Sequence, residues 1–196
     1  MKKYSVIGNP LEHSLSPKIH NYWFRENKIN AIYNKETLLD KDLENFIKKI
    51  KDKKIHGANV TVPFKEKIIK FIDILSKEAK DANSVNTIYM SNNNIIGHNT
   101  DIAGFYLSLK SENINLKDQN ILILGAGGVT PSIILGLRMM RVKKITVTNR
   151  TKEKALKLKE RFSYIDVSEW GEAVKANSII NTTSVGLKNT DKIQLD

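Results

Sequence analysis

The sequence predicts an α/β protein with two domains, and three observations lead to that prediction. Short apolar runs alternate with longer segments in which apolar residues recur every three or four positions, which is typical of strands that alternate with helices. A G-A-G-G turn at residues 125–128 follows the apolar run at 121–124 directly and precedes a helical pattern. Residues 111–120 are polar and show no periodicity. We therefore place the domain boundary at that segment, with one domain over residues 1–110 and the other over residues 111–196.

The composition narrows the function classes. The chain has 196 residues, of which 40% are hydrophobic and 27% charged, as in a globular protein, and no apolar run is long enough to span a membrane. The absence of cysteine excludes disulfides and thiolate metal sites, and the four histidines lack metal-ligand spacing, so we expect no metal. With no signal peptide either, a cytoplasmic location is expected. The net charge of +11 permits binding of small anions, but the lysines are scattered over helix faces, so no nucleic-acid partner is expected.

Each element expected in the first domain has its own local signal. Ser16 is a suitable N-cap and Pro17 a suitable first residue for a helix that would bury Ile19, Tyr22 and Trp23. Elsewhere, alternation of apolar and polar residues indicates strands, and apolar residues at helical spacing indicate helices. The expected strands cover residues 4–7, 31–36, 57–62, 85–90 and 95–98, and the expected helices cover residues 16–26, 40–51, 64–72, 76–81 and 102–109.

The segment around Lys65 holds the most informative local pattern of this domain. Val60 and Val62 alternate with polar residues as in a strand, and Pro63 suits the first position of the helix expected at 64–72. Lys65 then lies in the first helical turn, where the partial positive charge of the helix favours acids. Taken alone, this lysine is interpreted as a solvated surface residue.

The second domain opens on the pattern of a Rossmann-like, dinucleotide-binding fold. In the turn at residues 125–128, the first glycine permits a tight turn and the second lets the backbone approach a pyrophosphate, with the small Thr130 at the third position. The pyrophosphate would rest on N–H groups at the start of the following helix. The alternative is a tight turn that binds no ligand. The expected strands cover residues 121–124, 144–148, 164–167 and 178–181, and the expected helices cover about 129–140, 151–161 and 168–174.

The end of the next strand indicates which dinucleotide is bound. A fold that binds NAD usually carries an acidic residue there for the ribose 2′-hydroxyl. This chain has Asn149 and Arg150 instead, with Lys154 one turn further on, and a guanidinium can bind a 2′-phosphate. We therefore expect NADP rather than NAD. The alternative is a strand-end arginine that contacts only water.

Seven short motifs, taken together, resemble one family. They occur in a fixed order: S-L-S-P at 14–17, N-V-T-V-P-F-K at 59–65, S-V-N-T at 84–87, N-T-D at 99–101, G-A-G-G at 125–128, N-R-T at 149–151 and N-T-T-S-V-G-L at 181–187. In this order and at these separations they closely resemble the shikimate dehydrogenase family, over nearly the whole chain. The lysine and N-T-D motifs are specific to that family and its quinate-using relatives.

The resemblance implies a substrate domain and an NADP domain with a cleft between them. It also implies an oxidoreductase of the shikimate pathway to chorismate and the aromatic amino acids, which reversibly reduces 3-dehydroshikimate to shikimate with NADPH. Lys65 and Asp101 would form the pair that transfers the proton. A lysine ammonium suits this role because it supplies both a positive field and a proton for the developing alkoxide. The implied substrate ligands are Ser14 and Ser16 for the carboxylate, and Thr61, Asn86 and Asp101 for the ring hydroxyls.

The cofactor ligands are likewise implied by the resemblance. Gly125, Ala126, Gly127, Gly128 and Val129 would hold the pyrophosphate, and Asn149, Arg150, Thr151 and Lys154 would hold the 2′-phosphate.

The chain also departs from the family pattern. Pro131 stands where the family commonly has arginine, and Lys77 replaces an acidic residue that lies near the cofactor in some members, so that site is not carried over. Family members continue well beyond residue 196, so we expect a truncated chain with an incomplete second sheet, reduced stability, weak or absent activity, and self-association, for example as a homodimer. Two alternatives remain open: a quinate/shikimate dehydrogenase, and a non-catalytic fragment that binds NADP.

Overall fold

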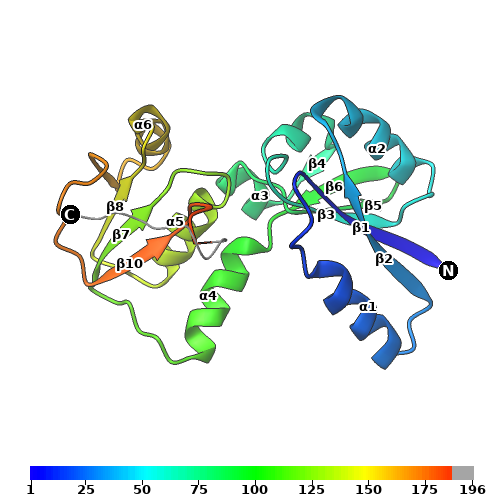
Figure 1. The fold of residues 1–196 in the computed structure, drawn as a ribbon, viewed down its shortest axis with the longest axis horizontal. Coiled ribbons are helices and arrows are strands. Elements are labelled where there is room, and N and C mark those ends of the chain that lie inside the picture. The colour runs from blue at the N-terminus through cyan, green and yellow to red at the C-terminus, as the bar shows by residue number, and fades with distance from the viewer. Residues whose placement is uncertain (187–196) are drawn as a thin grey trace. The chain divides into compact units, whose positions relative to one another are not determined.

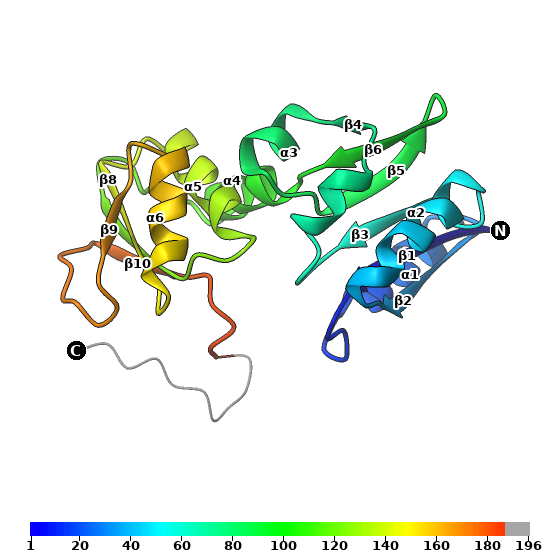
Figure 2. The same ribbon diagram turned by 90° about the horizontal axis from the view of Figure 1, so that it is seen from above.

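A computed structural model describes residues 1–186 of the chain, and these residues form mixed α/β layers as predicted (Figures 1 and 2). The contacts divide the chain into two compact units, the first ending at Thr100 and the second beginning at Asp101. The predicted boundary lay between residues 110 and 111, after the helix that begins the second unit. No helix among the described residues combines the length and apolar character needed to cross a membrane.

The first unit is built on a six-stranded mixed sheet with the order β2-β1-β3-β5-β6-β4. Parallel pairs join β1 to β2, β1 to β3 and β4 to β6, whereas β5 runs antiparallel to both β3 and β6. The strands predicted at 85–90 and 95–98 correspond to β5 and β6, which pair as a hairpin. The strands are β1 (Lys2–Gly8), β2 (Ala31–Thr37), β3 (Gly57–Val60), β4 (Ile74–Leu75), β5 (Thr87–Ser91) and β6 (Asn94–His98).

The helices α1 (Ser16–Glu26) and α2 (Leu43–Lys51) lie on opposite sides of this sheet (Figure 1). Alternation along β1 sends Ile7 into the main core with Phe46 and Ile50 of α2, and Val6 into a smaller cluster with Tyr33 and Phe24. The helical segments are α1 (Ser16–Glu26), the 3-10 turn η1 (Asp40–Asp42), α2 (Leu43–Lys51), the 3-10 turn η2 (Lys67–Phe71) and α3 (Lys77–Ala82).

The buried face predicted for α1 is wrong. Ile19, Tyr22 and Trp23 are 43%, 51% and 54% exposed. The polar Asn21 faces the sheet instead, because its side chain accepts from the backbone N–H of Tyr33 at 2.9 Å and donates to the Tyr33 carbonyl at 2.8 Å. The predicted N-cap is also displaced by one position. Leu15 caps the helix without a side-chain hydrogen bond.

The helix predicted at 64–72 is replaced by turns and the short η2 segment. Phe64 and Ile68 are buried as the helical spacing indicated, but the local backbone bonds are partly diverted. The Phe64 N–H donates back to Thr61, and the Lys65 carbonyl accepts from the N–H of Val85 at 2.8 Å. A continuous α-helical ladder through Lys65 therefore does not form, and Lys65 does not lie in the first turn of a helix.

The second unit contains a parallel four-stranded sheet with the order β10-β7-β8-β9. Its core lies around Ile123, Ile134 and Val147. The predicted strands 144–148 and 178–181 match β8 and β10. The helix predicted at 168–174 does not form: β9 ends at Ser168, and a loop follows. The elements are α4 (Asp101–Ser111), β7 (Asn120–Leu124), α5 (Thr130–Met139), β8 (Lys144–Thr148), α6 (Lys152–Arg161), β9 (Asp166–Ser168) and β10 (Ser178–Asn181).

Candidate functional site

The strand register of the first unit brings distant polar segments to one edge of its sheet. Ile7 near the end of β1 pairs with Val60 at the end of β3, Asn59 of β3 pairs with Thr87 at the start of β5, and Thr87 pairs with His98 at the end of β6. The loops that follow β1, β3 and β6 and the loop that precedes β5 therefore emerge at the same edge. These loops contain the predicted substrate residues Ser14, Thr61 and Asn86, and the loop after β6 leads into Asp101.

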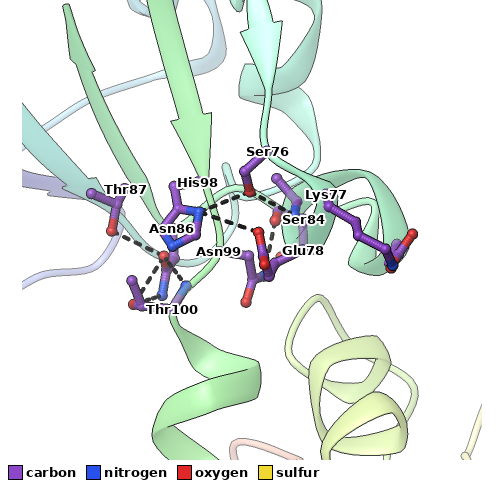
Figure 3. Close-up of polar contacts among 11 residues, drawn as sticks. Ser76, Lys77, Glu78, Ser84, Asn86, Thr87, His98, Asn99 and Thr100 are labelled. Atoms are coloured by element: carbon purple, nitrogen blue, oxygen red, sulfur yellow. Dashed lines mark hydrogen bonds and ion pairs between the residues drawn. The ribbon is translucent and has the colours of Figure 1, made fainter.

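Asn86 is the best-connected of these residues within the first unit (Figure 3). It is only 8% exposed, and its side chain holds Thr100 from both sides. Its amide donates to the Thr100 hydroxyl at 2.8 Å, and its Oδ1 accepts from the Thr100 N–H at 3.0 Å and from the Thr87 hydroxyl at 3.0 Å. The residue therefore fixes the backbone immediately before Asp101. Its role as a substrate ligand stays a prediction.

A chain of polar side chains runs from Tyr33 on β2 to Asn86. The Tyr33 hydroxyl donates to Asn59 Oδ1 at 2.6 Å, and the Asn59 amide donates to the Asn86 carbonyl at 3.3 Å and to the Thr87 hydroxyl at 3.2 Å. Burial raises the pKa of the Tyr33 hydroxyl far above its usual range, and this outweighs the opposite effect of the Asn59 backbone N–H, so the hydroxyl stays neutral. The ring of His20 stacks on Tyr33 with centroids 4.2 Å apart.

The two serines at the start of α1 lie together. The Ser14 hydroxyl donates to the Ser16 hydroxyl at 3.3 Å, and the Ser16 N–H donates to Ser14 Oγ at 3.4 Å. Both residues are half-buried, so two hydroxyls are presented at one place. Such a pair suits a carboxylate, because a hydroxyl can turn its proton toward an anion.

Thr61 and Lys65 follow β3 at the same sheet edge and are half-buried. The Thr61 N–H donates to the Ile7 carbonyl at 2.9 Å, so the backbone of Thr61 is held beside the end of β1. The Thr61 side chain also lies against Gly8, where a Cβ would approach Thr61 Cγ2 to 2.5 Å. Asp101 is the first residue of α4. The pairing of Lys65 with Asp101 stays a prediction.

Sequence reasoning missed four residues that organise this edge. Tyr33, Asn59, Thr87 and Thr100 connect Asn86 to the body of the sheet, yet none of them was predicted as a site residue. The available signal was a run of hydroxyl and amide residues beside strand ends, in the motifs at 59–65, 84–87 and 99–101. That signal could not show which members contact one another.

In the second unit, the glycine turn lies where a dinucleotide-binding sheet places it. It follows β7, which is flanked by β10 on one side and β8 on the other, so it sits at the point where the strand order reverses. Gly125 has φ +109°, and a Cβ there would approach Thr182 Oγ1 to 2.7 Å. Thr130, which is fully buried, donates to the Gly125 carbonyl at 3.1 Å and lies 2.9 Å from the Thr182 hydroxyl. The turn is therefore held by the two threonines.

Asn149 joins the glycine turn to the end of β8. Its Oδ1 accepts from the Ala126 N–H at 3.0 Å, and its amide donates to the Thr151 carbonyl at 2.8 Å. Asn149 therefore connects the glycine turn to the start of α6, and it is also a residue predicted to bind the 2′-phosphate. The predicted ligands Arg150, Thr151 and Lys154 are exposed beside it, and Gly128 and Val129 are half-buried at the start of α5.

The residues of this turn fit a phosphate-bearing dinucleotide. A Cβ at Gly127 would meet no atom within 4 Å, so the backbone there is open to close approach. Beside this turn, Arg150 has an exposed guanidinium and Lys154 of α6 an exposed ammonium, and both groups are donors suited to phosphate. Among residues 1–186, no group of histidine and acidic side chains is arranged to hold a metal ion.

Two family models match the chain, one for each half. The model described as the shikimate dehydrogenase substrate binding domain matches residues 6–88, and the model described as shikimate / quinate 5-dehydrogenase matches residues 108–189. A protein of Pelagibacter ubique named shikimate dehydrogenase (NADP(+)) is 52% identical over 195 residues, which cover 100% of this chain and 74% of that protein. Its namesake from Aquifex aeolicus is 42% identical over 96% of this chain and 70% of its own length.

Solved structures agree with these matches. The crystal structure of shikimate dehydrogenase from Aquifex aeolicus superposes with a TM-score of 0.91 at 42% identity, covering 98% of this chain and 72% of that one. The structure of the Thermus thermophilus enzyme in complex with NADP(H) and shikimate superposes with a TM-score of 0.86 at 33% identity, covering 95% of this chain and 70% of that one. From the sequence identity and the matched fold, this chain belongs to the shikimate dehydrogenase family.

Proposed function

We propose that this protein is an NADP-dependent oxidoreductase that interconverts 3-dehydroshikimate and shikimate. The observation that carries the proposal is the 52% identity, over the whole chain, to a relative named shikimate dehydrogenase (NADP(+)). The presence in both units of the polar groups that such a reaction needs supports it. The chain spans about three-quarters of that relative's length.

The carboxylate of the substrate binds the hydroxyls of Ser14 and Ser16. The 3.3 Å separation of these hydroxyls supports the assignment, since two adjacent donors can address the two oxygens of one carboxylate. Thr61, Asn86 and Asp101 bind the ring hydroxyls. The Asn86 side chain already forms hydrogen bonds with Thr100. It therefore binds the substrate with its remaining hydrogen-bonding capacity while it holds the backbone before Asp101.

Proton transfer belongs to Lys65 and Asp101. When 3-dehydroshikimate is reduced, negative charge develops on the former ketone oxygen, and the Lys65 ammonium stabilises that charge and donates the proton. In the opposite direction, neutral Lys65 accepts the proton from the hydroxyl. Asp101 holds the lysine and orients the adjacent hydroxyl.

The second unit binds NADP, which supplies the hydride when bound in its reduced form. Gly125, Ala126, Gly127, Gly128 and Val129 hold the pyrophosphate, and Asn149, Arg150, Thr151 and Lys154 hold the 2′-phosphate. The open approach to Gly127 supports the pyrophosphate site. The absence of an acid in the segment 149–151 supports the preference for NADP over NAD.

A steady-state assay of the full chain tests the proposal. NADPH formation from NADP and shikimate, followed by absorbance at several substrate concentrations, is expected to saturate in both substrates. NAD in place of NADP should give a much lower kcat/KM. Binding of NADP without turnover of shikimate would contradict the enzymatic proposal and leave a non-catalytic NADP-binding protein.

Quinate is the second candidate substrate, because the family model over residues 108–189 is described as shikimate / quinate 5-dehydrogenase. Quinate carries one more ring substituent than shikimate, so the same assay with quinate separates the two. We expect a kcat/KM for quinate well below that for shikimate. Comparable values would make the protein a dual quinate/shikimate dehydrogenase.

A further inference from the structure

The three residues that lead into Asp101 are each held by one segment of the first unit. The side chains of His98, Asn99 and Thr100 all form hydrogen bonds with residues 76–86, which comprise α3, its N-cap and the loop that follows it (Figure 3). We call this segment the α3 clamp. None of the predicted site residues except Asn86 belongs to it.

The first contact of the clamp is made at the N-terminus of α3. Ser76 caps the helix by accepting from the Ala79 N–H at 3.2 Å, and its hydroxyl also lies 2.8 Å from His98 Nδ1. Glu78 Oε2 lies 3.6 Å from the same nitrogen. Hydrogen bonds from its own backbone N–H and from Ser76, together with the nearby His98, lower the pKa of the Glu78 carboxyl, so Glu78 is an anion facing the ring.

This serine, histidine and glutamate do not form a nucleophilic triad. In such a triad the hydroxyl and the acid contact opposite ring nitrogens. Here both contact Nδ1, and the serine oxygen is already occupied as a helix cap. The arrangement instead fixes the orientation of the His98 side chain against the start of α3.

The second and third contacts continue along the chain. The Asn99 amide donates to the Ser84 carbonyl at 2.9 Å, and both residues are 1% exposed or less. Thr100 is then held by Asn86 through its hydroxyl and its N–H. The two segments are also joined through their backbones, because the Asn86 N–H donates to the His98 carbonyl at 3.0 Å.

The clamp is also bonded to the backbone of Lys65. The N–H of Val85, which lies between Ser84 and Asn86, donates to the Lys65 carbonyl at 2.8 Å. One short segment therefore holds the backbone of Lys65 and the three residues that precede Asp101. A shift in the clamp would change the position of the entry to Asp101 relative to Lys65.

We propose that His98 is a positioning residue. Together with Ser76 and Asn99, it holds residues 98–100, which lead into Asp101, in place relative to the backbone of Lys65 through the α3 clamp. The expected effect of His98 on turnover rests on the proposed shikimate dehydrogenase function. His98 itself touches neither substrate nor cofactor in this scheme. Its effect should therefore fall on turnover, because small displacements of reacting groups cost rate.

The test compares His98→Ala, which removes the ring, with His98→Asn, whose side-chain amide can restore a polar contact near the position of Nδ1. Asn94→Ala is the matched control, since Asn94 lies on the same strand at its other end and its side chain donates to the Asn92 carbonyl in the turn. For each variant, kcat and KM for shikimate and NADP are measured, together with amide hydrogen exchange over residues 98–101. His98→Ala should lower kcat by about ten- to a hundredfold with the KM for NADP unchanged, and speed exchange at Thr100.

His98→Asn should recover at least part of both losses, and Asn94→Ala should match the wild type. Unchanged kcat and unchanged exchange in His98→Ala would overturn the inference, as would equal losses in the alanine and asparagine variants. A wild-type chain without turnover would overturn the proposed function separately. In that case the exchange rates alone decide the inference, because faster exchange at Thr100 in His98→Ala supports the clamp and unchanged exchange refutes it.

Discussion

At the scale of single residues, Lys65 is distinguished from the other lysines of residues 1–186 by partial burial at a sheet edge with several hydroxyl and amide groups. Removing its ammonium removes both the proton donor and the charge that stabilises the developing alkoxide. We predict that Lys65→Ala lowers kcat by roughly 10²- to 10⁴-fold without changing the Kd for NADP, measured by steady-state kinetics and by fluorescence titration. Lys67→Ala is the control, because Lys67 is exposed and pairs with Asp40 on the surface. Equal loss of turnover and NADP binding would identify Lys65 as structural.

Arg150 provides a second prediction at the residue scale. It is exposed directly after Asn149, whose side chain is committed to Ala126 and Thr151, so the guanidinium is the charged group best placed for a 2′-phosphate. Arg150→Ala should weaken NADP binding by at least tenfold and NAD binding little, as measured by calorimetric titration, because loss of a charge-assisted hydrogen bond costs about 1.5–3 kcal/mol. Arg138→Ala, at the far end of α5, should leave the preference unchanged. An unaltered NADP/NAD ratio in Arg150→Ala would remove Arg150 from the cofactor site.

At the scale of the element, the glycine turn after β7 contains two glycines with different physical tasks. Gly125 has φ +109° and no room for a Cβ beside Thr182, whereas a Cβ on Gly127 would meet open space. Gly125→Ala should therefore lower the free energy of unfolding by about 1–3 kcal/mol, measured by urea denaturation. Gly127→Ala should leave stability nearly unchanged yet weaken NADP binding, because its methyl group occupies the approach to the pyrophosphate. Equal destabilisation by both substitutions would show that the turn is purely structural.

At the scale of the whole molecule, the net charge of +11 favours anionic ligands. Shikimate carries a carboxylate and NADP carries several phosphates, so both should be attracted to the protein before they bind. We predict that kcat/KM for both substrates falls as KCl is raised from about 0.02 to 0.5 M, because the Debye length shortens over that range. Sucrose at matched osmolality is the control. A kcat/KM independent of salt would show that the excess charge lies away from the routes of approach.

Prediction from the sequence succeeded where local chemistry decides the structure. The β7–turn–α5 unit follows from four apolar residues, the glycines and an amphipathic helix, and the structure shows it with the predicted order of elements. Prediction failed where another part of the chain competes for the same groups. The helix expected at 64–72 does not form because the Lys65 carbonyl accepts from Val85, twenty residues further along. Tyr22 and Trp23 of α1 stay exposed because Asn21 is bonded to Tyr33.

The sequence by itself determined the fold class, the order of most elements and the family, because hydrophobic periodicity, turn chemistry and ordered motifs are properties of neighbouring residues. Only the tertiary structure decided that Tyr33, Asn59, Asn86 and Thr100 form one hydrogen-bonded chain, and that residues 76–86 hold the entry to Asp101. These contacts join residues brought together by strand register, and register is set by pairing across the sheet rather than by local sequence.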